Sequence, residues 1–404
     1  MSTKLQRHKL SSLIDVKRGQ SISGEYYASE GEHVRLTLAN FDYVNGGFKV
    51  DTQKDDLFYT GPVKPECLLK KDDIITPLTE QALGLLGSTA RIPESDKYVQ
   101  SGDIALVTCK EGLIDPDFCY YLLPSKQVKK QLAAGSQQTK IRHTSPDAIK
   151  ACVVDIPDFE QQKKIGKYLS VIDRKISLNR AINANLKSLA KQIYDYWFVQ
   201  FDFPDENGRP YKSTGGKMVW NEMLNREVPE GWQVITIGEF AEVRRGTTIT
   251  KAQTKEGNVK VVAAAVDYSF LHNESNRTEY VITVSSSGAN AGFINFWREP
   301  IYASDCSTIQ CKTKEKTLFC YYWLIHFQEI LFSQQIGAAQ PHVYPEHISV
   351  LPIIVPPPSI LEKVKVFFLQ LNKKQFNCEK EAESLIKLRD ELLPLLMNGQ
   401  VTIE

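Results

Sequence analysis

Two long segments of the chain place apolar residues alternately four and three positions apart, the spacing of a helix that packs against another helix. The first segment, 160–201, contains no proline and a single glycine. Its apolar seam consists of Ile165, Leu169, Ile172, Ile176, Leu186, Ile193 and Trp197, with Asn179 and Asn183 as polar members. The second segment, 360–396, has a seam of Val364, Phe368, Leu371, Cys378, Ala382, Leu385, Leu392 and Leu396, with Gln375 and Arg389 as polar members.

These two segments predict two long helices that pair with each other. A helix of about 40 residues is roughly 60 Å long, and its apolar stripe needs a partner helix for burial. Because the chain has only these two long heptad segments, antiparallel pairing between them is the simplest solution. The alternative is that each helix pairs with a different subunit. Polar seam residues weaken such a pair but fix its register.

The remaining sequence predicts mixed helix and strand structure. The runs "GDIALVTC" (102–109) and "STIQC" (307–311) alternate in the manner of strands. Each is followed by a predicted helix that contains the tetrapeptide FCYY. The first helix begins at Asp115, a plausible N-cap before a proline, and stops at Gly135. The second begins at Phe319 and ends at Gly337.

Several motifs occur twice in the same order, which indicates an internal duplication. The sequence V-K-R-G at 16–19 matches V-R-R-G at 243–246, and FCYY at 118–121 matches FCYY at 319–322. The fold class predicted is therefore α+β: two tandem mixed α/β domains joined by two long antiparallel coiled-coil helices, with pseudo-twofold symmetry. The predicted bounds are domain 1 (1–157), a central long helix (158–201), a surface linker (202–232), domain 2 (233–357) and a C-terminal long helix (358–404).

Composition narrows the class of protein. The net charge of +1 neither requires nor excludes a nucleic-acid partner. The eight cysteines form no C-x-x-C pair, and we expect neither a metal site nor a disulfide framework. The chain has no apolar run of about 18 residues, and its first residues lack the apolar stretch of a secretory signal, so we expect a cytoplasmic protein.

Motifs of common enzymes are missing from the sequence. It contains no P-loop, no G-x-G-x-x-G after a strand, no G-x-S-x-G and no Asn/Asp-Pro-Pro-aromatic signature of an amino-methyltransferase. These absences argue against an enzyme, and no residue is assigned a catalytic role. A self-contained methyltransferase and a coiled-coil adaptor that holds only protein partners are the competing interpretations.

Positive signals favour DNA binding. Lys17 and Arg18 in one half, and Arg244 and Arg245 in the other, stand just before a turn-forming glycine, where they could contact phosphates or a groove. The alternative is a solvated loop or a local ion pair. The loops that follow the FCYY helices also match between the halves, although they could equally be hinges; their candidate residues are Gln137, Gln138, Lys140 and Arg142 in one half and Gln340, His342 and Tyr344 in the other. Two Gly-rich turns match as well, although plain hairpins also explain them; their candidate residues are Arg91 and Asn290.

In these features the chain resembles the specificity subunit of a type I restriction–modification system. The resemblance covers essentially the whole chain. It is carried by the V-[KR]-R-G starts, the FCYY helices and the turns at Ile156-Pro157 and Val355-Pro356 that lead into the long helices. The most specific pieces are the first long helix and the segment "GRPYKSTGGKMVWNEMLNREVPEGW" (208–232).

The resemblance implies a function in host defence. Each globular half would be a target recognition domain that reads a few base pairs of a bipartite double-stranded DNA site, and the paired helices would set the gap. The helices and nearby surface would dock two modification subunits, which bring S-adenosylmethionine and methylate adenine N6. Restriction subunits with ATP and Mg²⁺ would translocate and cut DNA. This chain would hold no cofactor, and the family offers no motif for its base contacts.

Overall fold

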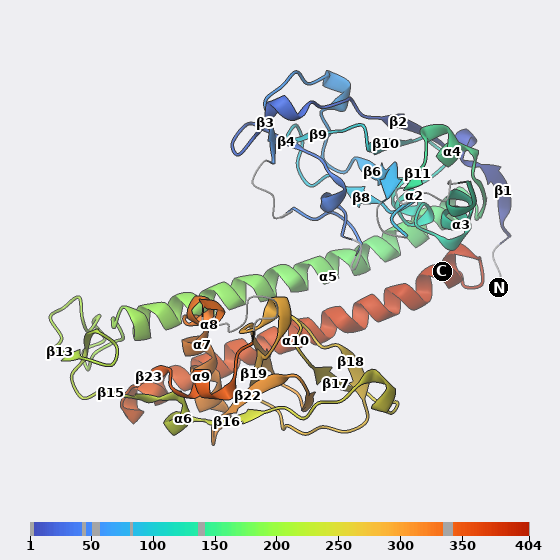
Figure 1. The fold of residues 1–404 in the computed structure, drawn as a ribbon. Helices are drawn as coiled ribbons and strands as arrows, with labels where there is room; N and C mark the ends of the chain where they lie inside the picture. The colour runs from blue at the N-terminus through green and yellow to red at the C-terminus, as the bar shows by residue number, and fades with distance from the viewer. Residues whose placement is uncertain are drawn as a thin grey trace. The chain divides into compact units, whose positions relative to one another are not determined.

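The computed structural model describes residues 4–42, 46–50, 57–80, 84–135, 142–333 and 342–403 (Figure 1). The chain divides into two compact units. Unit 1 comprises Met1–Leu178 with Glu381–Glu404, and unit 2 comprises Asn179–Lys380. Each unit therefore contains one mixed α/β domain together with part of each long helix.

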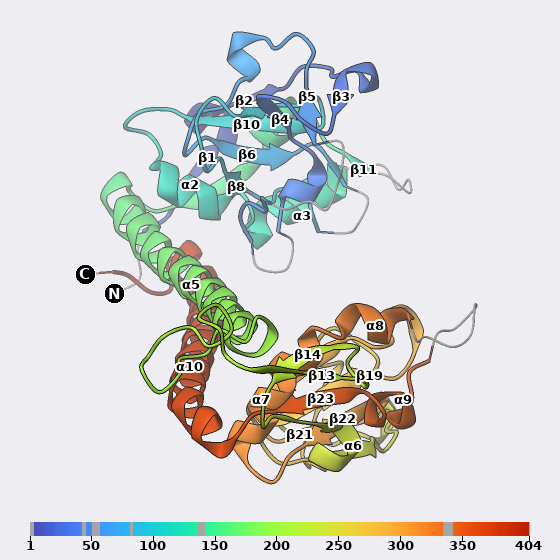
Figure 2. The ribbon, with the colours of Figure 1, turned by 90° about the vertical axis from the view of Figure 1, so that its left-hand side faces the viewer.

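Unit 1 is organised around a four-stranded antiparallel sheet. Its strands, in spatial order, are β2 (Ile14–Arg18), β10 (Ile104–Cys109), β6 (Ile74–Pro77) and β8 (Ala90–Arg91). Figure 2 shows β10 beside β6, which pair with Ile104 opposite Pro77. A second sheet has the order β3 (Tyr27–Ala28), β5 (Phe58–Tyr59), β4 (His33–Arg35) and β9 (Tyr98–Val99), with β4 and β9 parallel. Two-stranded pairs are β1 (Gln6–Lys9) with β12 (Val153–Ile156), and β7 (Thr79–Glu80) with β11 (Arg142–His143).

Unit 2 repeats this topology. Its four-stranded antiparallel sheet consists of β16 (Glu242–Arg245), β22 (Cys306–Gln310), β19 (Val281–Ser285) and β20 (Ile294–Trp297). Its second sheet consists of β18 (Phe270–His272), β17 (Val259–Val262) and β21 (Ile301–Ala303), again with one parallel pair, β17 with β21. The pair β15 (Gln233–Thr236) with β23 (Pro352–Val355) matches β1 with β12. The duplication predicted from the sequence is thus visible in the four-stranded sheet, in the parallel strand pair and in this two-stranded pair.

The short helices also correspond between the units, with one correction to the prediction. Unit 1 has α1 (Leu10–Leu13), α2 (Pro116–Leu122), α3 (Lys126–Gly135) and α4 (Pro146–Ala151), and unit 2 has α6 (Ile237–Phe240), α7 (Lys314–Ile325), α8 (Gln328–Ser333) and α9 (Pro345–Ser349). Asp115 does cap α2, since its carboxylate accepts a hydrogen bond from the Phe118 amide. The single helix predicted over 115–135 was wrong. Pro124 has no N–H and its ring clashes with the preceding turn, so the chain breaks into α2 and α3.

The second FCYY helix begins earlier than predicted. Helix α7 begins at Lys314 rather than at Phe319, because Thr313 caps it by accepting a hydrogen bond from the Lys316 amide. It ends at Ile325, and α8 follows. The predicted end at Gly337 lies outside the described residues.

The two long helices form as predicted. Helix α5 spans Phe159–Tyr194 and continues as one π-helical turn over Asp195–Val199, and α10 spans Pro358–Met397. In unit 1 the first part of α5 packs with the last part of α10, and in unit 2 the last part of α5 packs with the first part of α10. The predicted antiparallel pairing is therefore confirmed.

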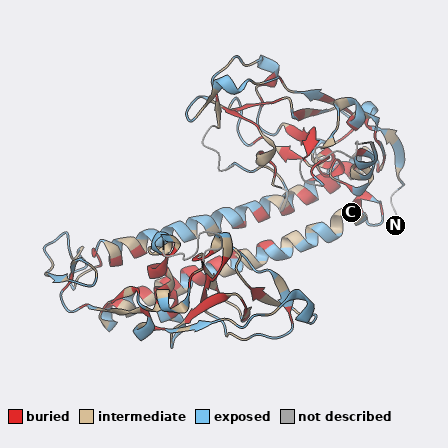
Figure 3. Cartoon of the chain, in the orientation of Figure 1, coloured by how far each residue is buried: buried red, intermediate tan, exposed pale blue. Residues whose placement is uncertain are grey.

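Most of the predicted seam is buried, as the recurring buried positions along both helices in Figure 3 show. The buried members are Ile165, Leu169, Ile172, Ile176, Val364, Phe368, Leu371, Cys378, Ala382 and Leu396, and the half-buried ones are Leu186, Ile193, Trp197, Leu385 and Leu392. Polar Asn179 and Gln375 are buried as well. The helices also bury residues of their own domains, so each domain core includes the helix that follows it.

The predicted surface linker over 202–232 is corrected by the structure. Its second half folds as a hairpin of β13 (Met218–Asn221) and β14 (Arg226–Pro229). Phe203 and Trp232 are buried in the core of unit 2 with their rings 5.0 Å apart. The prediction failed because glycine, proline and polar residues dominate the segment, while its few aromatic residues supply the burial.

A close backbone approach explains the glycine that follows the cationic pair in each half. A Cβ atom on Gly19 would lie 2.4 Å from the Ser101 carbonyl oxygen, and one on Gly246 would lie 2.1 Å from the Ser304 carbonyl oxygen. Real Cβ atoms do not approach backbone so closely, so only glycine fits.

We expect Gly19→Ala to lower the free energy of unfolding by about 1–3 kcal/mol, since the added methyl group overpacks rigid backbone. Gly102→Ala is a matched control beside it, because the nearest atom would lie 3.7 Å from its Cβ. Urea unfolding of both variants measures the difference. Equal stabilities would show that the backbone approach is not a constraint.

Candidate nucleic-acid interface

One end of the four-stranded sheet in unit 1 gathers segments that are far apart in the sequence. Strand β2 ends there at Arg18, paired with Ala105, and β6 ends there at Pro77. The Leu78 amide donates to the Asp103 carbonyl at 2.7 Å, and the Thr144 amide donates to the Leu78 carbonyl at 2.8 Å. This end of the sheet, where the strands run into loops, is called the loop end. In unit 1 it consists of Lys17–Gly19, Leu78–Glu80, Ser101–Asp103 and Arg142–Thr144.

The loop end of unit 2 is built by the same contacts. Strand β16 ends at Arg245, paired with Ser307. The Ser286 amide donates to the Asp305 carbonyl, and the Val343 amide donates to the Ser286 carbonyl at 3.0 Å. The loop end of unit 2 consists of Arg244–Gly246, Ser286–Asn290, Asp305 and His342–Tyr344. Each loop end thus brings a cationic pair together with residues in or next to the other two kinds of loop that the sequence selects.

The cationic pairs are exposed at both loop ends while their backbone is held. The side chains of Lys17, Arg18, Arg244 and Arg245 are exposed. The Lys17 carbonyl accepts a hydrogen bond from Gln100 Nε2 at 2.8 Å, and the Arg245 carbonyl accepts one from Arg277 Nη2 at 2.9 Å. Arg244 forms an ion pair with Glu242. The neighbouring strands therefore fix where the cations emerge.

In unit 1 the Gly-rich turn is organised by the buried carboxylate of Glu80. Its Oε2 accepts hydrogen bonds from the amides of Gly84, Leu85 and Leu86 at 3.1, 2.9 and 3.0 Å. Its Oε1 lies 3.8 Å from Arg142 Nη1. Strand pairing places Arg142 directly opposite Glu80. Glu80 thus ties the turn to the loop that follows α3.

In unit 2 the corresponding loops meet at one β-bridge. Ser287 bridges to His342, and Asn290 ends the short 3-10 turn η6 (Gly288–Asn290) just beyond it. The Ser287 hydroxyl donates to the Asp305 carboxylate. The His342 and Tyr344 rings stack with centroids 5.9 Å apart. These side chains offer donors, acceptors and a flat face at one place.

Arg91 is the described candidate that lies elsewhere. It pairs with Ile74, at the opposite end of β6 from Pro77. Its Nη2 forms an ion pair with Asp117 Oδ1 at 2.5 Å, and its guanidinium lies 4.9 Å from the Tyr120 ring centroid. These contacts tie β8 to α2, a structural role that the sequence did not indicate. Four other candidates, Gln137, Gln138, Lys140 and Gln340, lie outside the described residues.

Sequence reasoning missed His143. It pairs with Thr79 as His342 bridges to Ser287, so the two histidines are equivalent. A signal for this was available, because "HTSPD" (143–147) and "HVYPE" (342–346) share a histidine three residues before a proline and an acidic residue. The pattern was hidden by the different sequences on either side.

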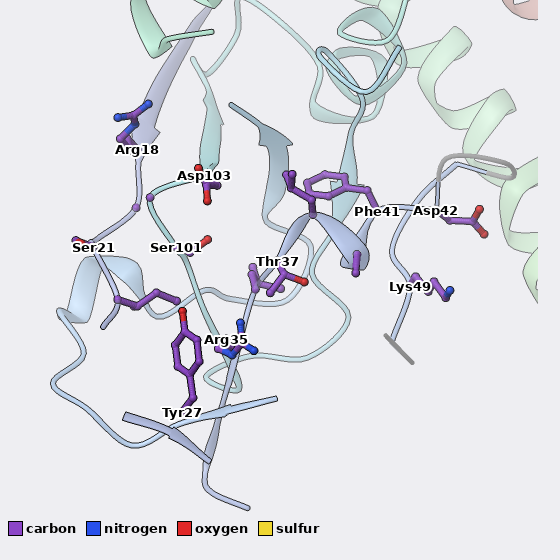
Figure 4. Close-up of a pocket in the computed structure, with 16 residues that line it drawn as sticks. Arg18, Ser21, Tyr27, Arg35, Thr37, Phe41, Asp42, Lys49, Ser101 and Asp103 are labelled. Atoms are coloured by element: carbon purple, nitrogen blue, oxygen red, sulfur yellow. The ribbon is translucent and has the colours of Figure 1, made fainter. Parts of the chain in front are cut away.

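A pocket of about 980 Å³ opens beside the loop end of unit 1 (Figure 4). Arg18, Tyr27, Arg35 and Lys49 line it together with Ser101 and Asp103 of the loop end. The Arg35 guanidinium lies 3.8 Å from the Tyr27 ring centroid. The sequence did not indicate Tyr27 and Arg35, because they lie on strands of two and three residues that carry no periodic signal.

The FCYY motif packs in the core, as predicted, and in unit 1 it also contacts a long helix. Phe118, Cys119 and Tyr121 are buried, and the Tyr121 hydroxyl donates to Asp173 Oδ2 on α5 at 2.6 Å. Burial and the nearby Asp173 carboxylate raise the pKa of Tyr121, so this phenol remains a donor. The motif therefore positions the domain on α5 as well as filling the core.

In the part of the chain that the structure describes, no three His, Cys, Asp or Glu side chains come together in a way that could hold a metal ion. Among the described helices, none is long and apolar enough to cross a membrane.

Comparison with protein families identifies the repeated domain. The family model for the type I restriction modification DNA specificity domain matches residues 7–188 and again 229–387. The chain belongs to this family. It is a specificity subunit of a type I restriction–modification system, with two tandem domains. Membership of this family assigns the chain a role in DNA recognition rather than in catalysis. Its partners are therefore DNA and other restriction–modification subunits.

The specificity subunit is similar to several relatives over most of its length. The type I restriction enzyme MjaIX specificity subunit of Methanocaldococcus jannaschii is 25% identical over 73% of this chain and 71% of the relative. The HindI specificity subunit of Haemophilus influenzae is 21% identical over 76% of this chain and 82% of the relative. The crystal structure of an S subunit from M. genitalium matches with a TM-score of 0.65 at 19% identity, covering 98% of this chain and 99% of that one, which supports the fold.

The contacts of Arg91 make a prediction about stability. We expect Arg91→Ala to lower the free energy of unfolding of the subunit by about 1–3 kcal/mol, since it leaves a half-buried carboxylate without its charged partner. Arg18→Ala removes an exposed cation, so it should change stability by less than about 0.5 kcal/mol. Chemical denaturation compares the two. A loss of stability in Arg18→Ala as large as in Arg91→Ala would contradict this assignment.

Proposed function

We propose that each loop end reads one half of a bipartite double-stranded DNA target. The observation that carries this proposal is the repetition: two sheets of the same topology present cations, polar side chains and a histidine at the same edge. Exposed Lys and Arg residues neutralise phosphates, while histidine, asparagine and arginine can hydrogen-bond base edges. Because the loops differ between the units, they would read different sequences on one scaffold.

The long helices are proposed to set the gap between the half-sites. Helix α5 has 36 residues and α10 has 40, which corresponds to roughly 54 and 60 Å. Both helices run through both units, and buried contacts fix their pairing in each unit. A paired helix segment of fixed length suits a spacer of fixed length.

An exposed apolar stripe on α5 supports docking of the modification subunits. In unit 1 the stripe contains Tyr168, Val171 and Leu178, and in unit 2 it contains Ile182 and Leu189. Val171 is 58% exposed and Leu178 is 53% exposed. At 3.6 residues per turn these side chains fall on one face of α5 about 80° wide, next to the buried seam. Such a stripe is the surface that a partner helix covers.

The occupants proposed for this surface are two modification subunits, with restriction subunits joining the assembled core. The modification subunits would bring S-adenosylmethionine and methylate adenine N6. The restriction subunits would bring ATP and Mg²⁺ to drive translocation and cleavage. The specificity subunit would contribute the DNA sequence to be read and the surface on which the others assemble.

The direct test is a map of methylated adenines. We expect the chain, co-expressed with the modification subunits of its own locus, to direct methylation to two short half-sites around a fixed gap. For the purified complex, Arg244→Ala/Arg245→Ala should reduce the slope of log affinity against log salt by up to about two, since each cation neutralises one phosphate. Arg209→Ala, an exposed arginine of the segment before the hairpin, is the control and should leave the slope unchanged.

Two results would contradict the proposal. Methylation at a single undivided motif would mean that only one domain reads DNA. A stable complex that adds no methylation would favour a coiled-coil adaptor.

The exposed stripe makes a separate prediction. Val171→Glu/Leu178→Glu should weaken binding of the modification subunit at least about tenfold, because charged residues then face its apolar surface. Ser177→Glu adds a single negative charge on a different face of α5 and should leave binding intact. Size-exclusion chromatography of the mixed subunits separates the outcomes. Equal binding by both variants would exclude the stripe as the docking surface.

A further inference from the structure

Arg298 joins domain 2 to α10 through three hydrogen bonds. It directly follows β20, and its side chain is only 12% exposed. Its Nε donates to Asn372 Oδ1 at 3.1 Å, its Nη2 to Gln375 Oε1 at 2.9 Å and its Nη1 to Glu379 Oε2 at 2.8 Å. The three acceptors are three and four positions apart on α10, so they form one row along the helix. Gln375, which the heptad pattern marks as a polar seam residue, thus has a partner in the domain.

The same contact extends to α5. The other carboxylate oxygen of Glu379, Oε1, accepts a hydrogen bond from Asn183 Nδ2 at 2.8 Å. The next residue of the domain, Glu299, forms ion pairs with Lys380 of α10 at 3.1 Å and with Lys260 of β17 at 2.9 Å. Domain 2, α10 and α5 therefore meet within unit 2 in one polar junction centred on Glu379.

Unit 1 contains a junction with the same three participants. Asp173 of α5 accepts a hydrogen bond from the Tyr121 hydroxyl of domain 1 at its Oδ2 atom, at 2.6 Å. Its Oδ1 atom forms an ion pair with Arg389 of α10 at 2.9 Å. A carboxylate on a long helix is again the centre. In unit 2 the arginine comes from the domain itself, which makes Arg298 the residue that bears on the domain's orientation.

Directional bonds add to what apolar packing provides. The hydrophobic effect itself has no preferred direction, so apolar burial alone selects a position along a helix less sharply than directional bonds do. A guanidinium has a rigid fork of donors, so buried Asn372 and Gln375 and half-buried Glu379 are satisfied together only when the domain sits at one position along α10. Any shift leaves buried acceptors unpaired, which costs free energy.

We propose that Arg298 is a positioning residue that fixes domain 2 at one place along the helix pair and thereby restricts the gap between the two DNA half-sites to a single length. This inference rests on the proposed function. Arg298 lies outside the loop end of unit 2, so it acts on the spacing of the target and leaves the sequence of either half-site unchanged.

The test compares Arg298→Lys and Arg298→Gln with the wild-type chain, each co-expressed with its modification subunits, by mapping methylated adenines. A lysine keeps the charge but lacks the fork, so it can satisfy only part of the row. We expect both half-sites to keep their sequences, while methylation at sites with a gap one base pair longer or shorter rises about tenfold relative to the wild type. Arg226→Lys is the matched control: Arg226 is a half-buried arginine of the same unit that donates to the Val199 carbonyl at 2.6 Å. It should keep the wild-type gap.

The possible outcomes separate this inference from the function on which it rests. A wild-type motif with two half-sites, together with an unchanged single gap in Arg298→Lys and Arg298→Gln, would overturn the positioning role alone. Loss of methylation at every site in both variants, in complexes that still assemble, would also overturn it, because a loosened domain should still read its half-site. An undivided wild-type motif would instead overturn the proposed function.

Discussion

The pairing of α5 with α10 is the constraint on which the rest of the structure depends. Neither helix can bury its apolar seam alone, and a fully buried Leu or Ile contributes about 1.5–3 kcal/mol. Because the two helices run antiparallel, each unit receives the first part of one and the last part of the other. Each domain core then includes residues of the helix that follows it, such as Leu169 in unit 1 and Phe368 in unit 2.

Polar groups along this pair give the arrangement its specificity. Asp173 and Glu379 are half-buried, and each is held between a domain and both helices, so losing one contact leaves a half-buried carboxylate with one partner fewer. The register of the helix pair therefore also determines where each domain attaches to the helices. At the loop ends, strand pairing places Arg18 and Arg245 at equivalent positions. The two units share the topology of the four-stranded sheet.

The sequence predicted the features that have a local period. Heptad spacing identified both long helices, and collinear motifs identified the duplication. A single proline at 124 was enough to break a predicted helix, because backbone chemistry overrides an apolar stripe. The predicted linker contains a hairpin whose burial comes from isolated aromatic residues such as Trp232, which no window of sequence reveals.

The candidate interface was only partly predictable for a related reason. The V-[KR]-R-G repeats located Arg18 and Arg245 because they stand next to a glycine whose place is fixed by backbone contact. Arg91 was selected by its neighbours in sequence, but β8 carries it to the opposite end of the sheet. His143 was missed, and so was the pocket around Arg35, because both depend on pairings between distant short strands.

Site-specific photo-crosslinking would test most directly whether the loop ends read DNA. A photoreactive residue would be placed at position 18, at position 245, or at position 110, which follows the far end of β10 and is exposed. Each variant would be assembled with its modification subunits and irradiated with target DNA. We expect the probe at 18 to crosslink to one half-site, the probe at 245 to the other, and the probe at 110 to neither. Crosslinking from 110 as strong as from 18, or from 18 and 245 to the same half-site, would contradict a DNA interface at the two loop ends.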